Sequence, residues 1–544
     1  MNRTLLVGYV FVATLAAASC SGPAKPATSN PPMSPTSAST VSATPPASPI
    51  VPAEPPVLNF PDEAFRAVRP GPAKQRPFAV PKVKQFSIGG QIDAYLIERH
   101  TLPTISLRLQ FEGGSVNDPN SKIGLASICM AMLVEGTAKL DKLEYKATLA
   151  DMASSISVMA GQETQMISLA TLTRNFPATF RLWKDTLLNP GFRQAELDRL
   201  IKRSLERLHQ QRKSVADVAR RVENSVLYGP THPFGKITNE ATLKAISIED
   251  CKNYHRTFLQ PRRAKLFVVG DLTEQAIRDQ FGKLLGEWKG TPPRTARLPR
   301  PRTRKGKIFF VDIPGAAQSM ISIKHFGPKR LDRNYFANKA MSDVIGGSFS
   351  ARVNMNLRED KGYSYGARAS LGYWRNYGVF TARSSVRANS TRQSILEFYR
   401  EIEAFRTGQK PATPDEIMRD QNSDILGIPA RFATARRALG TFSSLIYFGL
   451  PLNYYETMAE RIKRVTAKDI AAAAGKNLHP KDAVIVVVGD GSVAQITRRD
   501  GKDVPLLSQE GKPVTLKMAL AKLAGSGELG RGKLVVLDAD GNVQ

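Results

Sequence analysis

Alternation of apolar and polar residues predicts several half-buried β-strands in this chain. Residues 105–111, ISLRLQF, alternate with period two, and similar patterns recur at 154–161, 165–172, 364–374 and 378–386. Helical patterns lie between these strands, including the nearly all-apolar residues 123–134 and several helices over 176–259. Hairpin-like strand pairs that alternate with runs of helices predict an α+β fold with mostly antiparallel sheets.

An internal repeat divides the chain. SIEDCKNYHRTFLQPRRAKLFVVGDL begins at Ser247, and the similar segment TAKDIAAAAGKNLHPKDAVIVVVGDG begins at Thr466. The pairs matched at this single offset are Asp250 and Asp469, Pro261 and Pro480, Gly270 and Gly489, and Asp271 and Asp490. One shared offset over a helix, a proline turn and a buried strand predicts two homologous domains, 80–290 and 307–493. Residues 291–306 are a Pro-rich linker, and 494–544 are a polar, glycine-rich extension with one strand candidate at 533–541.

The N-terminus has the pattern of an export signal. Residues 1–20 contain Arg3, an apolar core and the small residues that precede Cys20. The segment resembles a bacterial lipoprotein signal, in which Cys20 is lipidated and Ser21 behind it favours the outer membrane. Residues 21–57 hold 11 of the 36 prolines and form a Pro/Ser/Ala-rich tether. The expected location is the periplasmic side of the envelope, and the alternative is an ordinary cleaved signal with an incidental cysteine.

Charge and cysteine content narrow the classes of function. The 544 residues carry a formal net charge of +29 and are 42% hydrophobic, which excludes an acidic or wholly disordered protein. No apolar run is long enough to span a bilayer, and the longest, at the N-terminus, is too short for a stable anchor helix. Export argues against a nucleic-acid partner for the positive charge. Cys129 and Cys251 lie in different helical patterns, and we expect buried thiols there rather than a disulfide.

Two glycine-rich segments carry a family resemblance. GGSVNDPNSKIGLASICMAMLVEGT begins at Gly113 and GGSFSARVNMNLREDKGYSYGARAS begins at Gly346. Together with the paired strands that end in VVGD, they resemble the two halves of a pitrilysin/insulinase-family zinc peptidase over residues 80–493. The resemblance implies two pitrilysin-like domains that form half of a clamshell around a peptide-sized chamber.

The family's zinc motif is degenerate here. The resemblance places an inverted His-x-x-Glu-His motif on the helix after Gly-Leu-Ala, and a third ligand, a Glu, about 76 residues later. Ser127 and Ala131 occupy the histidine positions, Met130 occupies the base position, and Arg207 stands at the third ligand position beside Glu206. We therefore expect no metal and no catalytic residue in this chain alone. His209 and Cys129 are conceivable replacement ligands, which we do not favour because the six histidines are isolated.

The second segment keeps the family's other half-site. An Arg and a Tyr seven residues apart hold the substrate in the family, and Arg358 and Tyr365 match that pair. A guanidinium and a phenol suit a peptide carbonyl or its oxyanion. The alternative is that Arg358 pairs with a local carboxylate and Tyr365 packs at a strand end.

Two other motifs in this region are weak. Residues 362–366, GYSYG, match the G-x-S-x-G pattern of α/β-hydrolases, but no buried strand precedes them. Residues 346–348 lack the lysine of a phosphate-binding loop.

Two hypotheses of function follow. In the first, the chain is the non-catalytic subunit of a heterodimer: a zinc-bearing paralogue supplies the metal, and this chain supplies chamber wall, Arg358 and Tyr365 for peptide substrates. In the second, it is an envelope-anchored peptide-binding or scaffold protein with no part in hydrolysis.

Overall fold

The computed structural model of the chain describes residues 78–294, 298–301, 306–527 and 532–544, together with 63, 65, 67 and 529. The predicted signal at 1–20, Cys20 and the tether at 21–57 lie outside these residues, and the linker at 291–306 is described only in part. Residues 74–544 cluster as one compact unit, which is described below. Within the described residues, no helix is both long and apolar enough to cross a bilayer.

The first repeat is built on a six-stranded sheet with the order β1-β2-β6-β3-β5-β4. All neighbouring strands are antiparallel except β2 and β6. The strand predicted at 105–111 is the central strand β3, whose apolar residues enter the core and whose polar residues face the other side. The strands are β1 (Lys84–Ile88), β2 (Ile92–Glu98), β3 (Thr104–Glu112), β4 (Ser155–Ala160), β5 (Thr164–Leu172) and β6 (Lys265–Gly270).

Helices cover one face of this sheet and enclose a core around Trp183, Phe281 and Tyr145. They are α1 (Leu125–Met132), α2 (Lys142–Asp151), α3 (Phe176–Leu188), α4 (Gln194–Gln211), α6 (Glu240–Lys244), α7 (Ile248–Phe258) and α8 (Glu274–Glu287). Helix α5 (Val215–Tyr228) also belongs to this repeat but packs on the second sheet. The helices predicted over 176–259 are therefore confirmed.

The second repeat has the same arrangement. Its sheet has the order β14-β7-β11-β8-β10-β9, so β7, β11, β8, β10 and β9 correspond in order to β2, β6, β3, β5 and β4. The strands are β7 (Ile308–Asp312), β8 (Gln318–Gly327), β9 (Ser364–Tyr373), β10 (Gly378–Arg387) and β11 (Val484–Gly489). Two α+β domains of similar topology confirm the repeat that the shared offset predicts.

Helices again cover one face of the second sheet, around Phe380, Phe398 and Tyr363. They are α9 (Tyr335–Ser342), α10 (Arg352–Asn354), α11 (Thr391–Arg406), α12 (Pro414–Leu426) and α15 (Ala467–Asn477), with π-helical turns η6 (Asp343–Gly347) and η7 (Met355–Asp360). Helices α13 (Ala435–Phe448) and α14 (Met458–Lys463) also belong to this repeat, but their buried apolar residues join the cluster on the first sheet.

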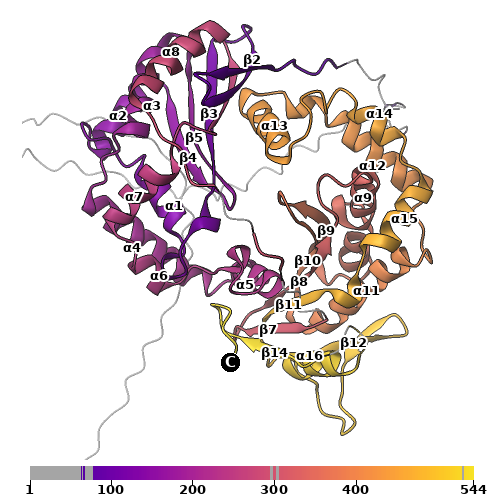
Figure 1. The fold of residues 1–544 in the computed structure, drawn as a ribbon. Helices are drawn as coiled ribbons and strands as arrows, with labels where there is room; N and C mark the ends of the chain where they lie inside the picture. Colours follow the sequence, from indigo (N-terminus) through magenta and orange to yellow (C-terminus); the bar gives the residue numbers. More distant parts are fainter. Residues whose placement is uncertain are drawn as a thin grey trace, which may run out of the picture. The chain divides into compact units, whose positions relative to one another are not determined.

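The two repeats exchange helices. Helix α5 of the first repeat packs on β8 and β11 of the second sheet, and helix α13 of the second repeat packs on β3 and β6 of the first (Figure 1). The two helices are equivalent, because they begin at positions separated by almost the same offset as the repeat. Each helix buries apolar side chains on the sheet face that the other repeat leaves uncovered: Val222 of α5 shares a cluster with Val486, and Phe442 of α13 shares one with Phe267. Each sheet therefore needs both repeats to bury both faces.

The C-terminal extension belongs to the second sheet. Strand β14 (Val535–Leu537) pairs with β7 and takes the edge position that β1 holds in the first sheet. Helix α16 (Leu516–Gly525) buries Leu516, Leu520 and Leu523 in the second core, and a two-stranded hairpin, β12 (Ile496–Arg499) and β13 (Lys502–Pro505), precedes it. The strand predicted at 533–541 is confirmed, whereas the sequence pattern did not indicate α16.

Candidate functional site

The helix that carries the metal motif in the resembling family is α1. Gly124 precedes it with a φ of 108°, a left-handed conformation that favours glycine. The buried carboxylate of Asp118 accepts hydrogen bonds from the backbone N–H groups of Gly124 at 2.9 Å and Ala126 at 3.0 Å. Burial raises the pKa of Asp118 to about 6, against the lowering effect of these bonds. Asp118 thus fixes the start of α1.

The side chains at the motif positions of α1 do not suit a zinc ion. Ser127 is exposed, Ala131 is half-buried, and Met130 is buried in the first core with 1% of its surface accessible. No imidazole or carboxylate stands at any of the three positions, so this helix offers neither zinc ligands nor a base for a zinc-bound water.

The predicted position of the third ligand lies on α4. Glu206 and Arg207 are both exposed there, and the next residue, Leu208, is the one that enters the core. Ion pairs hold α4 to the segment that follows α1, because Arg199 contacts Glu135, and Lys142 lies 2.9 Å from Glu135.

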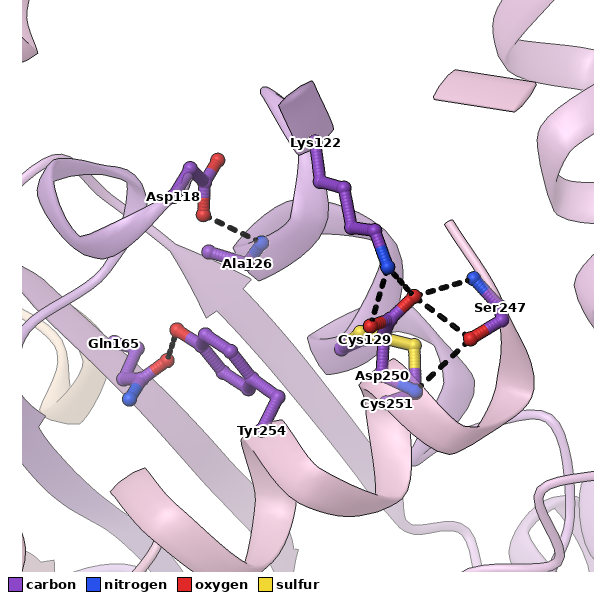
Figure 2. Close-up of a disulfide and its surroundings, with 9 residues drawn as sticks. All are labelled: Asp118, Lys122, Ala126, Cys129, Gln165, Ser247, Asp250, Cys251 and Tyr254. Carbon is purple, nitrogen blue, oxygen red and sulfur yellow. Dashed lines mark hydrogen bonds and ion pairs between the residues drawn. A yellow bond between two sulfur atoms is a disulfide. The ribbon is translucent and has the colours of Figure 1, made fainter. Parts of the chain in front are cut away.

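The expectation of two buried thiols is wrong, because Cys129 and Cys251 form a disulfide (Figure 2). Helix α1 packs on α7, which brings the two Cα atoms to 4.8 Å although 122 residues separate them in the sequence. Different helical patterns do not keep two cysteines apart when the helices pack side by side. The sequence did contain an indication of the disulfide: two cysteines follow the predicted export signal, and exported proteins commonly form disulfides.

A salt bridge beside the disulfide also joins α1 to α7. Lys122, in the turn before α1, lies 2.6 Å from the carboxylate of Asp250 (Figure 2). Asp250 in turn accepts hydrogen bonds from the backbone and hydroxyl of Ser247 at the start of α7. Nearby, the hydroxyl of Tyr254 donates to the side-chain carbonyl of Gln165 on β5 (Figure 2). Helix α1 and the turn before it are thus joined to α7 by a disulfide and a salt bridge.

The six histidines are distributed over separate environments. The replacement ligands considered for zinc are not available as a pair, since Cys129 is in the disulfide and His209 lies 3.4 Å from Glu240. His100 contacts Asp271, His232 contacts the carbonyl of Pro299, His255 contacts that of Leu187, and His325 and His479 lie edge to face. Within the part of the chain that the structure describes, no three His, Cys, Asp or Glu side chains are grouped to hold a metal ion.

The second predicted half-site lies where η7 leads into β9. Tyr365, the second residue of β9, exposes 88% of its surface, and its hydroxyl has no hydrogen-bond partner among the described residues. The guanidinium of Arg358 lies 4.5 Å from the ring centroid of Phe349, and its Nε is 3.2 Å from Glu359. Both partners of this ion pair are more than a third exposed, so the pair contributes little to stability. The alternative is thus met in part: Arg358 pairs with the local carboxylate of Glu359 in an exposed ion pair, whereas Tyr365 does not pack at the strand end.

The loop between Arg358 and Tyr365 is anchored by the other tyrosine of the GYSYG sequence. Tyr363 is fully buried, and its hydroxyl donates to Asp503 on β13 at 2.9 Å. Gly362 supports this turn with a φ of 63°. Alternate tyrosines thus point inward and outward: Tyr363 fixes the loop to the extension, and Tyr365 presents its phenol to solvent.

Comparisons with known proteins agree with these features. The model of the insulinase family (peptidase family M16) matches residues 94–228, and that of the peptidase M16 inactive domain matches residues 245–422. The non-peptidase homolog YmxG of Helicobacter pylori is 23% identical over 381 residues, covering 69% of this chain and 86% of the relative.

Solved structures show the same fold. The peptidase M16 inactive domain from Pseudomonas fluorescens superimposes with a TM-score of 0.70 at 22% identity, over 76% of this chain and 99% of that one. A protease from Helicobacter pylori gives 0.66 at 15% identity, over 75% and 100%. These matches place the chain in the pitrilysin/insulinase family, peptidase family M16, as a member that lacks the zinc motif at Ser127, Met130 and Ala131.

Proposed function

We propose that the chain is the non-catalytic subunit of a two-chain zinc peptidase. In this role it binds peptides with Arg358 and Tyr365, and a zinc-bearing paralogue supplies the metal and the base. The observation that carries the proposal is the contrast between the two half-sites. The metal positions are filled by groups that cannot bind zinc, whereas Tyr365 is 88% exposed with a hydroxyl that no described residue engages.

The chemistry of the retained pair supports this role. The phenol of Tyr365 is a neutral donor and the guanidinium of Arg358 a charged one, and both kinds of donor stabilise the oxyanion of a peptide carbonyl under attack. The exposed ion pair with Glu359 costs little to break, so Arg358 is available to a ligand. In this proposal the partner subunit, the zinc-bearing paralogue, holds the metal ion, and this chain holds none.

The disulfide supports an exported location. Disulfides persist in oxidising compartments such as the bacterial periplasm and are rare in the cytosol. The Cys129–Cys251 bond therefore agrees with the signal at 1–20, with lipidation at Cys20 and with an envelope location.

The test is peptide hydrolysis by this chain, by its zinc-motif paralogue and by the mixture. We expect activity only in the mixture, and we expect Arg358→Ala to lower that rate by about 10² to 10³, as for the loss of one oxyanion donor. Tyr365→Phe should lower it without altering assembly, measured by gel filtration. Arg262→Ala, which removes an exposed arginine elsewhere, serves as the matched control. An unchanged rate in Arg358→Ala and Tyr365→Phe would instead support the scaffold hypothesis.

A further inference from the structure

Two arginines face each other on neighbouring strands of the second sheet. Arg368 on β9 and Arg383 on β10 are direct partners in the antiparallel register, and both side chains are exposed. Directly opposed residues project from the same face with Cβ atoms about 5 Å apart. Like charges in this arrangement destabilise the strand pair. The chain thus maintains an unfavourable pair in its folded state.

The surroundings of the pair contain donors but no free acid. Ser370 and Thr381 form the next cross-strand pair on this face, and Ser322 lies opposite Arg383 on β8. Neither arginine makes an ion pair or hydrogen bond with another residue of the described part of the chain. The acid on this face, Glu223, already contacts Lys324 at 3.0 Å and Ser322 at 2.8 Å.

A third cation, Lys324, lies on β8 opposite Thr381, two residues along from Ser322. Its charge is compensated by Glu223 in the buried salt bridge. Burial lowers the pKa of Lys324, Glu223 opposes that effect, and the charge of Arg383 lowers the pKa further. The two arginines are thus the cations of this group that have no acidic partner among the described residues.

The free edge of β9 does not offer an alternative binding mode by strand addition. The backbone N–H of Ala367 donates to the side-chain oxygen of Asn354 at 2.9 Å, and that of Leu371 donates to the hydroxyl of Ser342 at 3.0 Å. These side chains occupy the groups that an added strand would use. A peptide that binds β9 would therefore contact the side chains on the face that carries Arg368 rather than the backbone at the free edge.

We infer that Arg368 and Arg383 form a binding site for the carboxylates of an acidic peptide segment. Paired guanidiniums bind carboxylates through several charge-assisted hydrogen bonds, which relieves their mutual repulsion. Arg368 follows Tyr365 by three positions on the same strand, a span of about 10 Å. Strict alternation would place residues three positions apart on opposite faces of the strand. The register shift between Ser384 and Val386, opposite the start of β9, marks a bulge, and a bulge changes the direction of the side chains beside it. This inference rests on the proposed function in peptide binding. It adds that the bound peptide carries acidic side chains close to the residues that bind Tyr365.

The test is fluorescence anisotropy of the purified full chain with three labelled ten-residue peptides, identical except for two central Glu, Gln or Lys residues. We expect the Glu peptide to bind at least about tenfold more tightly than the Gln peptide, with an affinity that falls as salt rises. Arg368→Gln with Arg383→Gln should abolish this preference. The control, Arg203→Gln with Arg262→Gln, removes two exposed arginines elsewhere and should leave it within about twofold.

A melting curve shows whether the double variant folds. Because the opposed charges repel, Arg368→Gln with Arg383→Gln should melt at the same temperature as the wild type or higher. Equal affinity for the Glu and Gln peptides, or an equal loss in the control, would refute the acidic site. Such a result leaves the proposed function intact if Arg358→Ala still slows hydrolysis of a neutral peptide by the mixture. Loss of the Arg358 effect with a retained Glu preference would refute only the proposed function.

Discussion

Lys324 on β8 lies 3.0 Å from Glu223 on α5, so a buried salt bridge joins the second sheet to a helix of the first repeat. The two side chains are only 7% and 12% exposed, and the amide oxygen of Asn224 accepts a further hydrogen bond from the ammonium at 3.1 Å. Since water cannot replace a lost partner there, each charge depends on the other.

Removal of one partner of this pair should therefore be costly. We expect Glu223→Ala to lower the free energy of unfolding by about 3–5 kcal/mol, because it leaves a buried ammonium without its carboxylate. Replacement of both partners, Glu223→Leu with Lys324→Met, should cost much less than the single change. Urea unfolding curves measure both. Glu510→Ala, which removes the exposed partner of Lys512, is the control, and an equally small effect at Glu223 would contradict the prediction.

The disulfide should make a large contribution to stability. It joins α1 to α7 across a sequence separation of 122, and loss of a native disulfide typically costs about 2–5 kcal/mol. We expect Cys129→Ser and Cys251→Ser to lower the melting temperature by similar amounts, and the double variant to add little. Thiol titration of the unfolded wild type with and without reductant checks that the bond is present. Identical melting curves for the wild type and the double variant would count against this contribution.

His325 should contribute a loss of stability in acid. It is buried on β8 against Phe380, its Nε2 accepts the backbone N–H of His479, and burial lowers its pKa from 6.5 to about 4. The unfolded chain therefore takes up the proton first as pH falls, so stability is present above about pH 6.5 and is lost towards pH 4, by up to about 3 kcal/mol. Unfolding curves at several pH values should show a smaller acid loss for His325→Gln.

Two buried carboxyl groups have the opposite effect on stability as the pH falls towards 4. Burial raises the pKa values of Asp118 and Asp343 to about 6, so the folded chain binds their protons first and their contribution grows as pH falls. The difference between wild type and His325→Gln at each pH separates the histidine from these groups. A difference that does not change between pH 7 and pH 4 would contradict the assignment.

Restoring the family motif on α1 alone should not restore zinc binding. The triple variant Ser127→His, Met130→Glu and Ala131→His still lacks a third ligand, because the third-ligand position holds Arg207, whose guanidinium does not bind zinc. It also buries a carboxylate where Met130 is 1% exposed. Metal analysis after dialysis should find no stoichiometric zinc, whereas addition of Arg207→Glu should increase retention. One zinc per triple-variant chain would overturn this account of the site.

Local patterns predicted much of the fold. Strand patterns in the sequence located β3, β4, β5, β9 and β10, because side chains in a strand alternate between core and surface. The single offset between matched segments revealed the two repeats. Which elements pack on one another in three dimensions was harder to predict. The contact of α1 with α7 that joins Cys129 to Cys251, and the addition of β14 to the second sheet, depend on residues far apart in the sequence.

The candidate site shows the same division. The family resemblance nominated Arg358 and Tyr365 and identified the lost metal positions, since each could be matched to a residue of this sequence. The opposed pair of Arg368 and Arg383 needed the strand register, because a sequence does not state which residues of β9 and β10 face each other.

The exchange of α5 and α13 between the repeats has a consequence for how the polypeptide is made. A gene fragment that encodes one repeat would not encode an autonomous domain, since its sheet would expose the apolar face that Phe267 or Val486 occupies. During synthesis the first repeat must wait for α13, which begins only at Ala435, long after β6 ends at Gly270, before its sheet is covered on both sides. The apolar face of that sheet is therefore open to aggregation until most of the chain has been made.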